Sequence, residues 1–228
     1  IAIGQSALYA QTSTATGAIA IGWLSQRYYT NSGGAGSTSL GYETLFYNQS
    51  GGHNTAMGYG ALKGASGQSN SYNVAVGSRA MVSITTGDSN TAVGMDSAYA
   101  LTSGHRNIMI GRNSGATLTT QDDNVIIGYE AGNDTSGQKA VIIGNYAADD
   151  QSPTNAVIIG YRAGRVIQGE NTTAVGYDAL RYTTESDNTA VGAYALTALV
   201  DGENNTALGI AAGYRIDKGD DSTFLGWY

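Results

Sequence analysis

Residues 188–196 read Asn-Thr-Ala-Val-Gly-Ala-Tyr-Ala-Leu, and this stretch decides the fold because variants of it recur along the chain. A short apolar run ends in glycine fourteen times between Gly4 and Gly226. Successive glycines of these runs lie 16 to 19 residues apart. This period is too short for helical-hairpin repeats and is typical of one coil of a β-solenoid. The sequence therefore predicts an all-β fold, a parallel β-solenoid or β-roll of about fourteen short coils.

The glycine that ends each run is predicted to mark a sharp corner, because glycine permits positive φ and close backbone approach. Asparagine often precedes the run, as at Asn90 and Asn188, and stacked asparagines can form amide ladders. We interpret both residue types as architectural. The coil-turn glycines assigned on this basis are Gly58, Gly77, Gly94, Gly111, Gly128, Gly144, Gly160, Gly176, Gly192 and Gly209.

Both faces of the predicted strands are expected to be buried, because side chains alternate between the two faces. The residue before glycine is always Val, Ile, Leu or Met, and this position is predicted to face the coil interior. The central residue is never charged, which predicts a second face covered by a partner chain. A layer formed by Ile126, Ile142 and Ile158 is expected to hold the chains together. The full set assigned to core and trimer packing is Ile110, Ile126, Ile127, Ile142, Ile143, Ile158, Ile159 and Val191.

The composition of the 228 residues excludes several classes of protein. There is no cysteine, so disulfide scaffolds and cysteine-ligated metal sites are impossible. A net charge of −7 repels phosphate and argues against nucleic-acid partners. The longest aliphatic runs, such as Val157–Ile159, are far shorter than the roughly 20 residues of a transmembrane helix. We therefore expect neither nucleic-acid binding nor membrane insertion.

The repeats carry a resemblance to a known family. Asn-Thr-Ala-Val-Gly at 90–94 and 188–192 resembles the head repeats of YadA-like trimeric autotransporter adhesins. The longer runs at 188–196 and 173–180 are similar to repeats of phage tail-fibre proteins, notably those of marine phages. The resemblance covers essentially the whole chain. It implies a left-handed parallel β-roll, three copies of which pack into a homotrimeric rod, although coils of 16–19 residues are longer than the adhesin unit.

The same resemblance implies a function. The chain would be a structural and receptor-binding fibre of a bacteriophage, a stiff trimeric shaft in the virion that presents loops for host attachment. Its partners would be other tail or fibre proteins and a glycan or protein of the host cell surface. A trimeric adhesin on the bacterial cell surface and a polysaccharide-degrading tailspike remain as alternatives. No nucleophile elbow appears, so we expect no enzymatic activity and no cofactor.

Residues 1–228 are interpreted as one β-solenoid repeat region, within which residues 23–53 are irregular and rich in aromatic residues and glycine. Because the chain begins and stops close to a repeat strand, we expect it to be a segment of a longer fibre. Trp23, Tyr28 and Tyr29 are the candidate receptor loop, since aromatic rings with polar tips suit sugars, and coil–coil packing is the alternative.

Other residues attract attention without supporting a site. Tyr59, Tyr129, Tyr161 and Tyr177 each follow a repeat glycine directly, and this regular placement favours a packing role. The two histidines, His53 and His105, have no second ligand at a suitable spacing. The sequence therefore predicts no metal site.

Overall fold

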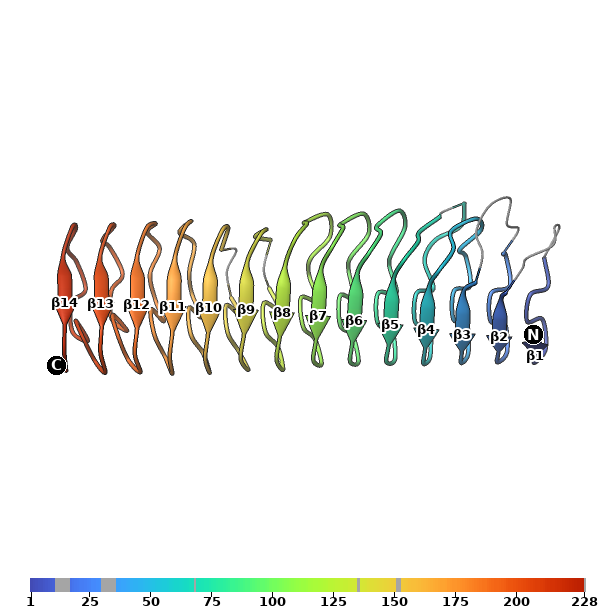
Figure 1. Cartoon of the computed structure of the whole chain (residues 1–228), viewed down its shortest axis with the longest axis horizontal. Coiled ribbons are helices and arrows are strands. Elements are labelled where there is room, and N and C mark those ends of the chain that lie inside the picture. Colours follow the sequence, from blue (N-terminus) through green and yellow to red (C-terminus); the bar gives the residue numbers. More distant parts are fainter. Residues whose placement is uncertain (11–16, 30–35, 68, 135, 151–152, 228) are drawn as a thin grey trace. The chain divides into compact units, whose positions relative to one another are not determined.

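The computed structural model describes residues 1–10, 17–29, 36–67, 69–134, 136–150 and 153–227. These ranges contain strands, turns and bends but no helix. The protein is an all-β parallel β-solenoid, which confirms the fold class that the repeat period predicts (Figure 1). The chain divides into two compact units, Ile1–Asp122 (unit 1) and Asp123–Tyr228 (unit 2).

Each coil contributes one short strand, placed at the apolar run before the repeat glycine. The strands of unit 1 are β1 (Ala2–Ile3), β2 (Ile19–Ile21), β3 (Thr38–Leu40), β4 (Thr55–Met57), β5 (Val74–Val76), β6 (Thr91–Val93) and β7 (Ile108–Ile110). Those of unit 2 are β8 (Val125–Ile127), β9 (Val141–Ile143), β10 (Val157–Ile159), β11 (Thr173–Val175), β12 (Thr189–Val191), β13 (Thr206–Leu208) and β14 (Thr223–Leu225).

Successive strands within each unit pair in parallel and in register, so equivalent residues of neighbouring coils lie side by side. In unit 2, Ile126 is the partner of Ile142, and Ile142 is the partner of Ile158. In unit 1, Ala75 is likewise the partner of Ala92. The apolar repeat therefore becomes a set of columns that run from coil to coil.

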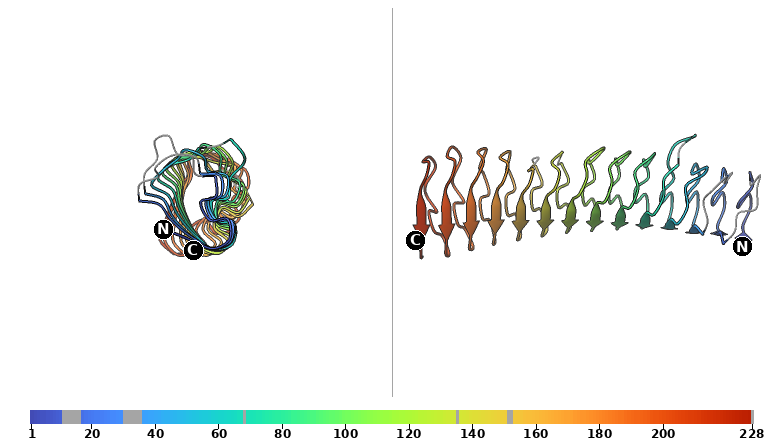
Figure 2. Two further views of the ribbon diagram at one scale, coloured as in Figure 1. Left: turned by 90° about the vertical axis from the view of Figure 1, so that its right-hand side faces the viewer. Right: turned by 45° about the horizontal axis from the view of Figure 1, so that its top comes forward.

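Hydrogen bonding between coils continues beyond the strands into the turns. Figure 2 shows looped return paths between successive strands. On this path the amide of Gly132 donates to the carbonyl of Ala147 at 2.9 Å, and the amide of Asp134 donates to that of Asp149 at 3.0 Å. Buried backbone polar groups need such partners, so stacking of coils satisfies turns that would otherwise require water.

The repeat glycine is required for two physical reasons. Gly58 has a φ of +122° and Gly128 a φ of +141°, which L-residues with a side chain rarely adopt. A Cβ on Gly58 would also lie 2.6 Å from the carbonyl oxygen of Gly77 in the next coil. Since the contact is with backbone, it cannot be relieved by a side-chain rotation. All ten coil-turn glycines named above have positive φ.

The predicted assignment of the two strand faces is wrong. The central residues Ile126, Ile142 and Ile158 are 0–1% exposed in the single chain, so they belong to its own core and cannot form a layer between chains. The flanking residues lie on the outside: β8 to β10 are buried at the centre and half-buried or exposed at both ends. The same pattern holds for β2 to β7 in unit 1.

The narrow coil explains why the central residue points inward. In many coils it is alanine, as at Ala92 and Ala190, and it is fully buried there. Alanines three residues after the repeat glycine, such as Ala131, and larger residues of the return path, such as Ile167 and Leu199, fill the remaining interior. Because the interior of the coil is narrow and closely packed, it does not accommodate a bulky central residue in every strand.

Candidate functional site

An apolar strip lies on the outside of the strands. We call it the outer strip: the residue directly before each repeat glycine and the residue two places before that one. None of these positions is charged. In the single chain Leu208 is 50% exposed and Ile159 is 36% exposed. The members directly before a repeat glycine are Ile3, Ile21, Leu40, Met57, Val76, Val93 and Ile110 in unit 1, and Ile127, Ile143, Ile159, Val175, Val191, Leu208 and Leu225 in unit 2.

The outer strip contains five of the eight residues that the sequence assigned to core and trimer packing: Ile110, Ile127, Ile143, Ile159 and Val191. An uncharged apolar column of this kind is unusual on the surface of a soluble monomer, where it marks an interaction site. The strip is therefore the surface at which another molecule is expected to pack.

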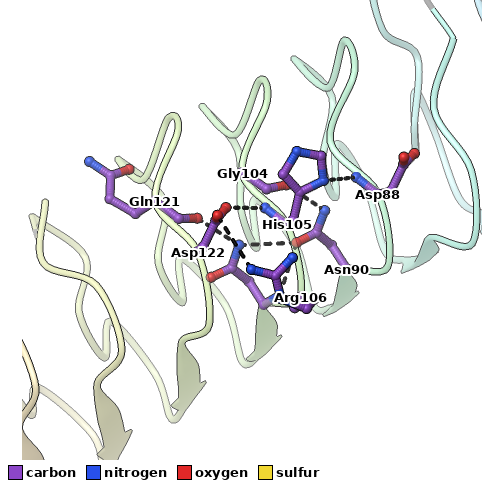
Figure 3. A network of polar contacts seen from close by, with 8 residues as sticks. Asp88, Asn90, Gly104, His105, Arg106, Gln121 and Asp122 are labelled. Atoms are coloured by element: carbon purple, nitrogen blue, oxygen red, sulfur yellow. Dashed lines mark hydrogen bonds and ion pairs between the residues drawn. The ribbon is translucent and has the colours of Figure 1, made fainter.

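Buried asparagines connect coils of unit 1 at the turns that precede β4 to β7, and part of this arrangement is drawn in Figure 3. The Asn90 amide group donates to the carbonyl of Gly104 at 2.8 Å and to Oδ1 of Asn73 at 3.1 Å. Its Oδ1 accepts from the backbone and side-chain nitrogens of Asn107, both at 3.0 Å. Asn90 is fully buried. The predicted asparagine ladder therefore exists, and it satisfies turn amides as expected.

The same arrangement recurs in unit 2. The Asn188 amide group donates to the carbonyl of Gly202 at 2.8 Å, and its Oδ1 accepts from the backbone nitrogen of Asn205 at 3.0 Å. Asn205 in turn donates to Gly219 at 2.6 Å. The asparagines are therefore part of the scaffold in both units.

His105 belongs to a second polar column, drawn in Figure 3. The backbone amide of Ser71 donates to the Asp88 carboxylate at 2.6 Å, and that of His105 donates to the Asp122 carboxylate at 2.7 Å. Between them, the Asp88 amide donates to Nδ1 of His105 at 3.1 Å. The imidazole thus takes the place of a carboxylate acceptor, which requires its proton to be on Nε2.

The other histidine also has a local contact. The His53 ring stacks on Tyr72 with centroids 5.1 Å apart and planes 7° apart. Over the described part of the chain, no three histidine, aspartate or glutamate side chains gather closely enough to hold a metal ion.

The candidate receptor loop is divided between surface and core. Trp23 is 51% exposed and packs edge-on against Tyr42, whereas Tyr28 is half-buried and stacks on Tyr47. Tyr29 is only 1% exposed, so its ring is not available to a receptor. Residues 30–35 of the irregular segment lie outside the described residues.

Unit 2 carries a continuous row of aromatic rings, of which the repeat pattern revealed only Tyr129, Tyr161 and Tyr177. We call it the tyrosine ladder. Adjacent ring centroids are 5.2 to 6.0 Å apart. The four rings nearest the C-terminus are 37–42% exposed. The ladder consists of Tyr129, Tyr146, Tyr161, Tyr177, Tyr194 and Tyr214.

An ion pair fixes a cation beside the ladder. The Arg162 guanidinium donates two hydrogen bonds of 2.9 Å to the Asp178 carboxylate and lies 5.4 Å from the Tyr161 ring centroid. The Asp178 side chain is only 4% exposed. Its hydrogen bonds and charge raise the pKa of Arg162, so this arginine stays protonated. Burial is the main cause that raises the pKa of Tyr194, whose phenol therefore remains a neutral donor at ordinary pH.

Comparisons with known proteins leave the family open. No protein-family model, no curated protein and no solved structure matches the chain. In the described ranges there is also no helix that combines the length and apolarity needed to cross a membrane.

Proposed function

We propose that the chain is a shaft segment of a bacteriophage fibre, located in the virion, in which three copies associate through the outer strip and exposed side chains contact the host surface. The observation that carries this proposal is the uncharged, half-buried to exposed apolar strip that repeats along the strands of each unit. The role is structural and adhesive rather than enzymatic. The number of copies and the phage context rest on the resemblance of the repeats to tail-fibre and adhesin proteins.

A second copy of the chain is the occupant that suits the strip best. The strip repeats with the coil, so its partner must present a matching apolar repeat, and an identical chain does so. Oligomers of soluble proteins are mostly closed and symmetric, which favours the same strip on every subunit around an axis. Burying isoleucine and valine side chains that are half-exposed in the single chain supplies the driving force.

The internal construction of each unit suits a mechanical role. Backbone hydrogen bonds join consecutive coils both in the strands and in the turns, and buried asparagines add side-chain bonds between coils. Coils held in this way expose few unpaired backbone groups to proteases or to force. A stiff spacer between a virion and a cell surface needs this property.

Sedimentation equilibrium tests the assembly. We expect a mass three times the 23.5 kDa of the chain. Ile143→Asp places a charge on the outer strip and is expected to yield folded monomers, whereas Thr120→Asp at an exposed position outside the strip is expected to leave the mass unchanged. A wild-type monomer at all concentrations would contradict the assembly.

Immunogold labelling tests the biological context separately. Antibodies raised against the chain are expected to decorate the tail fibres of phage particles that carry this sequence. Labelling confined to the outer surface of bacterial cells would support the adhesin alternative and contradict the fibre.

A further inference from the structure

We propose that the tyrosine ladder of unit 2 binds an extended, neutral glycan chain that lies along the direction in which the coils stack. The inference deepens the proposed attachment role, on which it rests for the source of the glycan, by naming the ligand class and the residues that contact it. It concerns the ladder alone and not the outer strip.

The spacing of the rings suits a polymer of sugar rings. One tyrosine comes from each successive coil of the ladder, and adjacent centroids are 5.2 to 6.0 Å apart. The coils themselves repeat at about 4.8 Å, the distance between hydrogen-bonded strands. A pyranose unit in an extended chain has a similar length, so consecutive sugars can meet consecutive rings without a mismatch that grows along the chain.

The exposure of the rings distinguishes the ladder from a packing motif. Tyr161, Tyr177 and Tyr194 pack against their neighbours, yet each remains 39–42% exposed. Tyr161 and Tyr177 stack on each other with their planes 17° apart, so the exposed outer side of the row offers apolar ring surface to the C–H groups of a sugar and phenol hydroxyls to its hydroxyl groups. A buried structural column would have hidden these surfaces, as happens to Tyr29 in unit 1.

The charge of the unit selects a neutral ligand. Unit 2 contains 14 acidic and 6 basic residues, whereas unit 1 contains 4 acidic and 5 basic residues. The net charge of −8 on unit 2 repels acidic polysaccharides and nucleic acids. Arg162, whose guanidinium lies 5.4 Å from the Tyr161 ring centroid, is already paired with Asp178, although its side chain keeps 26% exposure and can still donate to a hydroxyl.

A second copy of this chain is a less suitable occupant. The outer strip consists of aliphatic residues and threonine, whereas the ladder presents rings with hydroxyl groups beside a guanidinium–carboxylate pair. The ladder also begins after the corner glycine, as at Tyr129 next to Gly128, outside the strand that carries the strip. A polyhydroxylated ligand satisfies these polar groups, and an aliphatic surface does not.

Isothermal titration of the full chain with neutral hexasaccharides tests the proposal. The probes are cellohexaose, xylohexaose and mannohexaose, with a hexamer of galacturonic acid as the acidic comparison. We expect at least one neutral probe to bind and the acidic one not to bind. The double variant Tyr161→Ala/Tyr177→Ala is expected to bind about tenfold or more weakly, because two stacking rings are lost.

Two further variants separate binding from folding. Tyr161→Phe/Tyr177→Phe keeps both rings and is expected to retain more affinity than the alanine pair. Tyr72→Ala removes an exposed tyrosine of unit 1 that is not part of the ladder and is expected to bind as the wild type does. Binding of none of the neutral probes, or equal affinity of the wild type and the alanine pair, would overturn the proposal.

Sedimentation of the same samples keeps the two proposals distinguishable. If the alanine pair loses glycan binding and keeps the mass of the wild type, the ladder is supported as the glycan site and the assembly is unaffected. A monomeric wild type that still binds a neutral hexasaccharide would contradict the trimer and leave the ladder supported.

Discussion

Replacing Asn90 with alanine tests how much the asparagine ladder stabilises unit 1. The side chain is fully buried and makes two donor and two acceptor contacts. After Asn90→Ala, Oδ1 of Asn73 keeps the backbone amide of residue 90, and the Asn107 amide group keeps the carbonyl of Gln121. The Gly104 carbonyl loses the Asn90 amide group that donates to it.

The magnitude follows from the Gly104 carbonyl. A buried polar group left without a partner costs about 1–3 kcal/mol, so Asn90→Ala is expected to lower the free energy of unfolding by about that amount. The assay is urea unfolding of the full chain followed by far-UV circular dichroism. The midpoint of unit 1 should shift to a lower urea concentration.

Gln121→Ala is the matched control. The Gln121 side chain also accepts two backbone amides, from Thr119 at 2.8 Å and Thr120 at 3.0 Å, but these contacts are exposed and water can replace them. We expect a loss below about 1 kcal/mol. The reasoning is refuted if Asn90→Ala is no more destabilising than Gln121→Ala.

Two other predictions concern unit 2. Gly160→Ala places a Cβ on a residue with a φ of +139° and against the carbonyl of Gly176, so it should destabilise the folded state by about 1–3 kcal/mol or more in thermal unfolding. The control is Gly67→Ala in unit 1, where a Cβ would meet open space. A smaller effect of Gly160→Ala than of Gly67→Ala would contradict this prediction. Burial, followed by the charge of Asp150, raises the pKa of Asp149, so the ionised form destabilises the folded state and stability falls as pH rises through that pKa. Asp149→Asn should therefore have a higher urea midpoint than the wild type at pH 7, and the two midpoints should become equal below the ordinary aspartate pKa of 3.8. Equal midpoints at pH 7 would contradict this prediction.

The sequence predicted the coil and its corners because both depend on a local, repeated requirement. A glycine such as Gly128 is needed wherever φ is positive and the next coil approaches, so it recurs at the coil period. All fourteen apolar runs form strands, because each run meets the same local requirement once per coil. Periodicity is therefore a sufficient signal for where the chain turns and where it pairs.

The direction of the strand faces could not be obtained from hydrophobicity, because both faces are apolar. Residue size carried the missing signal in the coils whose central residue is alanine, but not in β8 to β10, where the central residue is isoleucine. Alanine at the centre, as at Ala92, fits a narrow interior, whereas the flanking Val or Ile fits an outside with no limit on volume. Three members of the tyrosine ladder, Tyr146, Tyr194 and Tyr214, were missed for a different reason. Tyr146 and Tyr214 lie two and five residues after their glycines, so only the folded turns bring them into one row.

Single-cysteine labelling tests most directly which residues of a strand face inward and which form the outer strip. The chain has no cysteine, so each introduced thiol reports on one position. In the folded protein, the Ile142→Cys thiol should resist a maleimide at every protein concentration. The Ile143→Cys thiol should react readily in dilute protein and become protected as the concentration rises and chains associate. An Ile142→Cys thiol that reacts in the folded protein as fast as in urea would contradict the account.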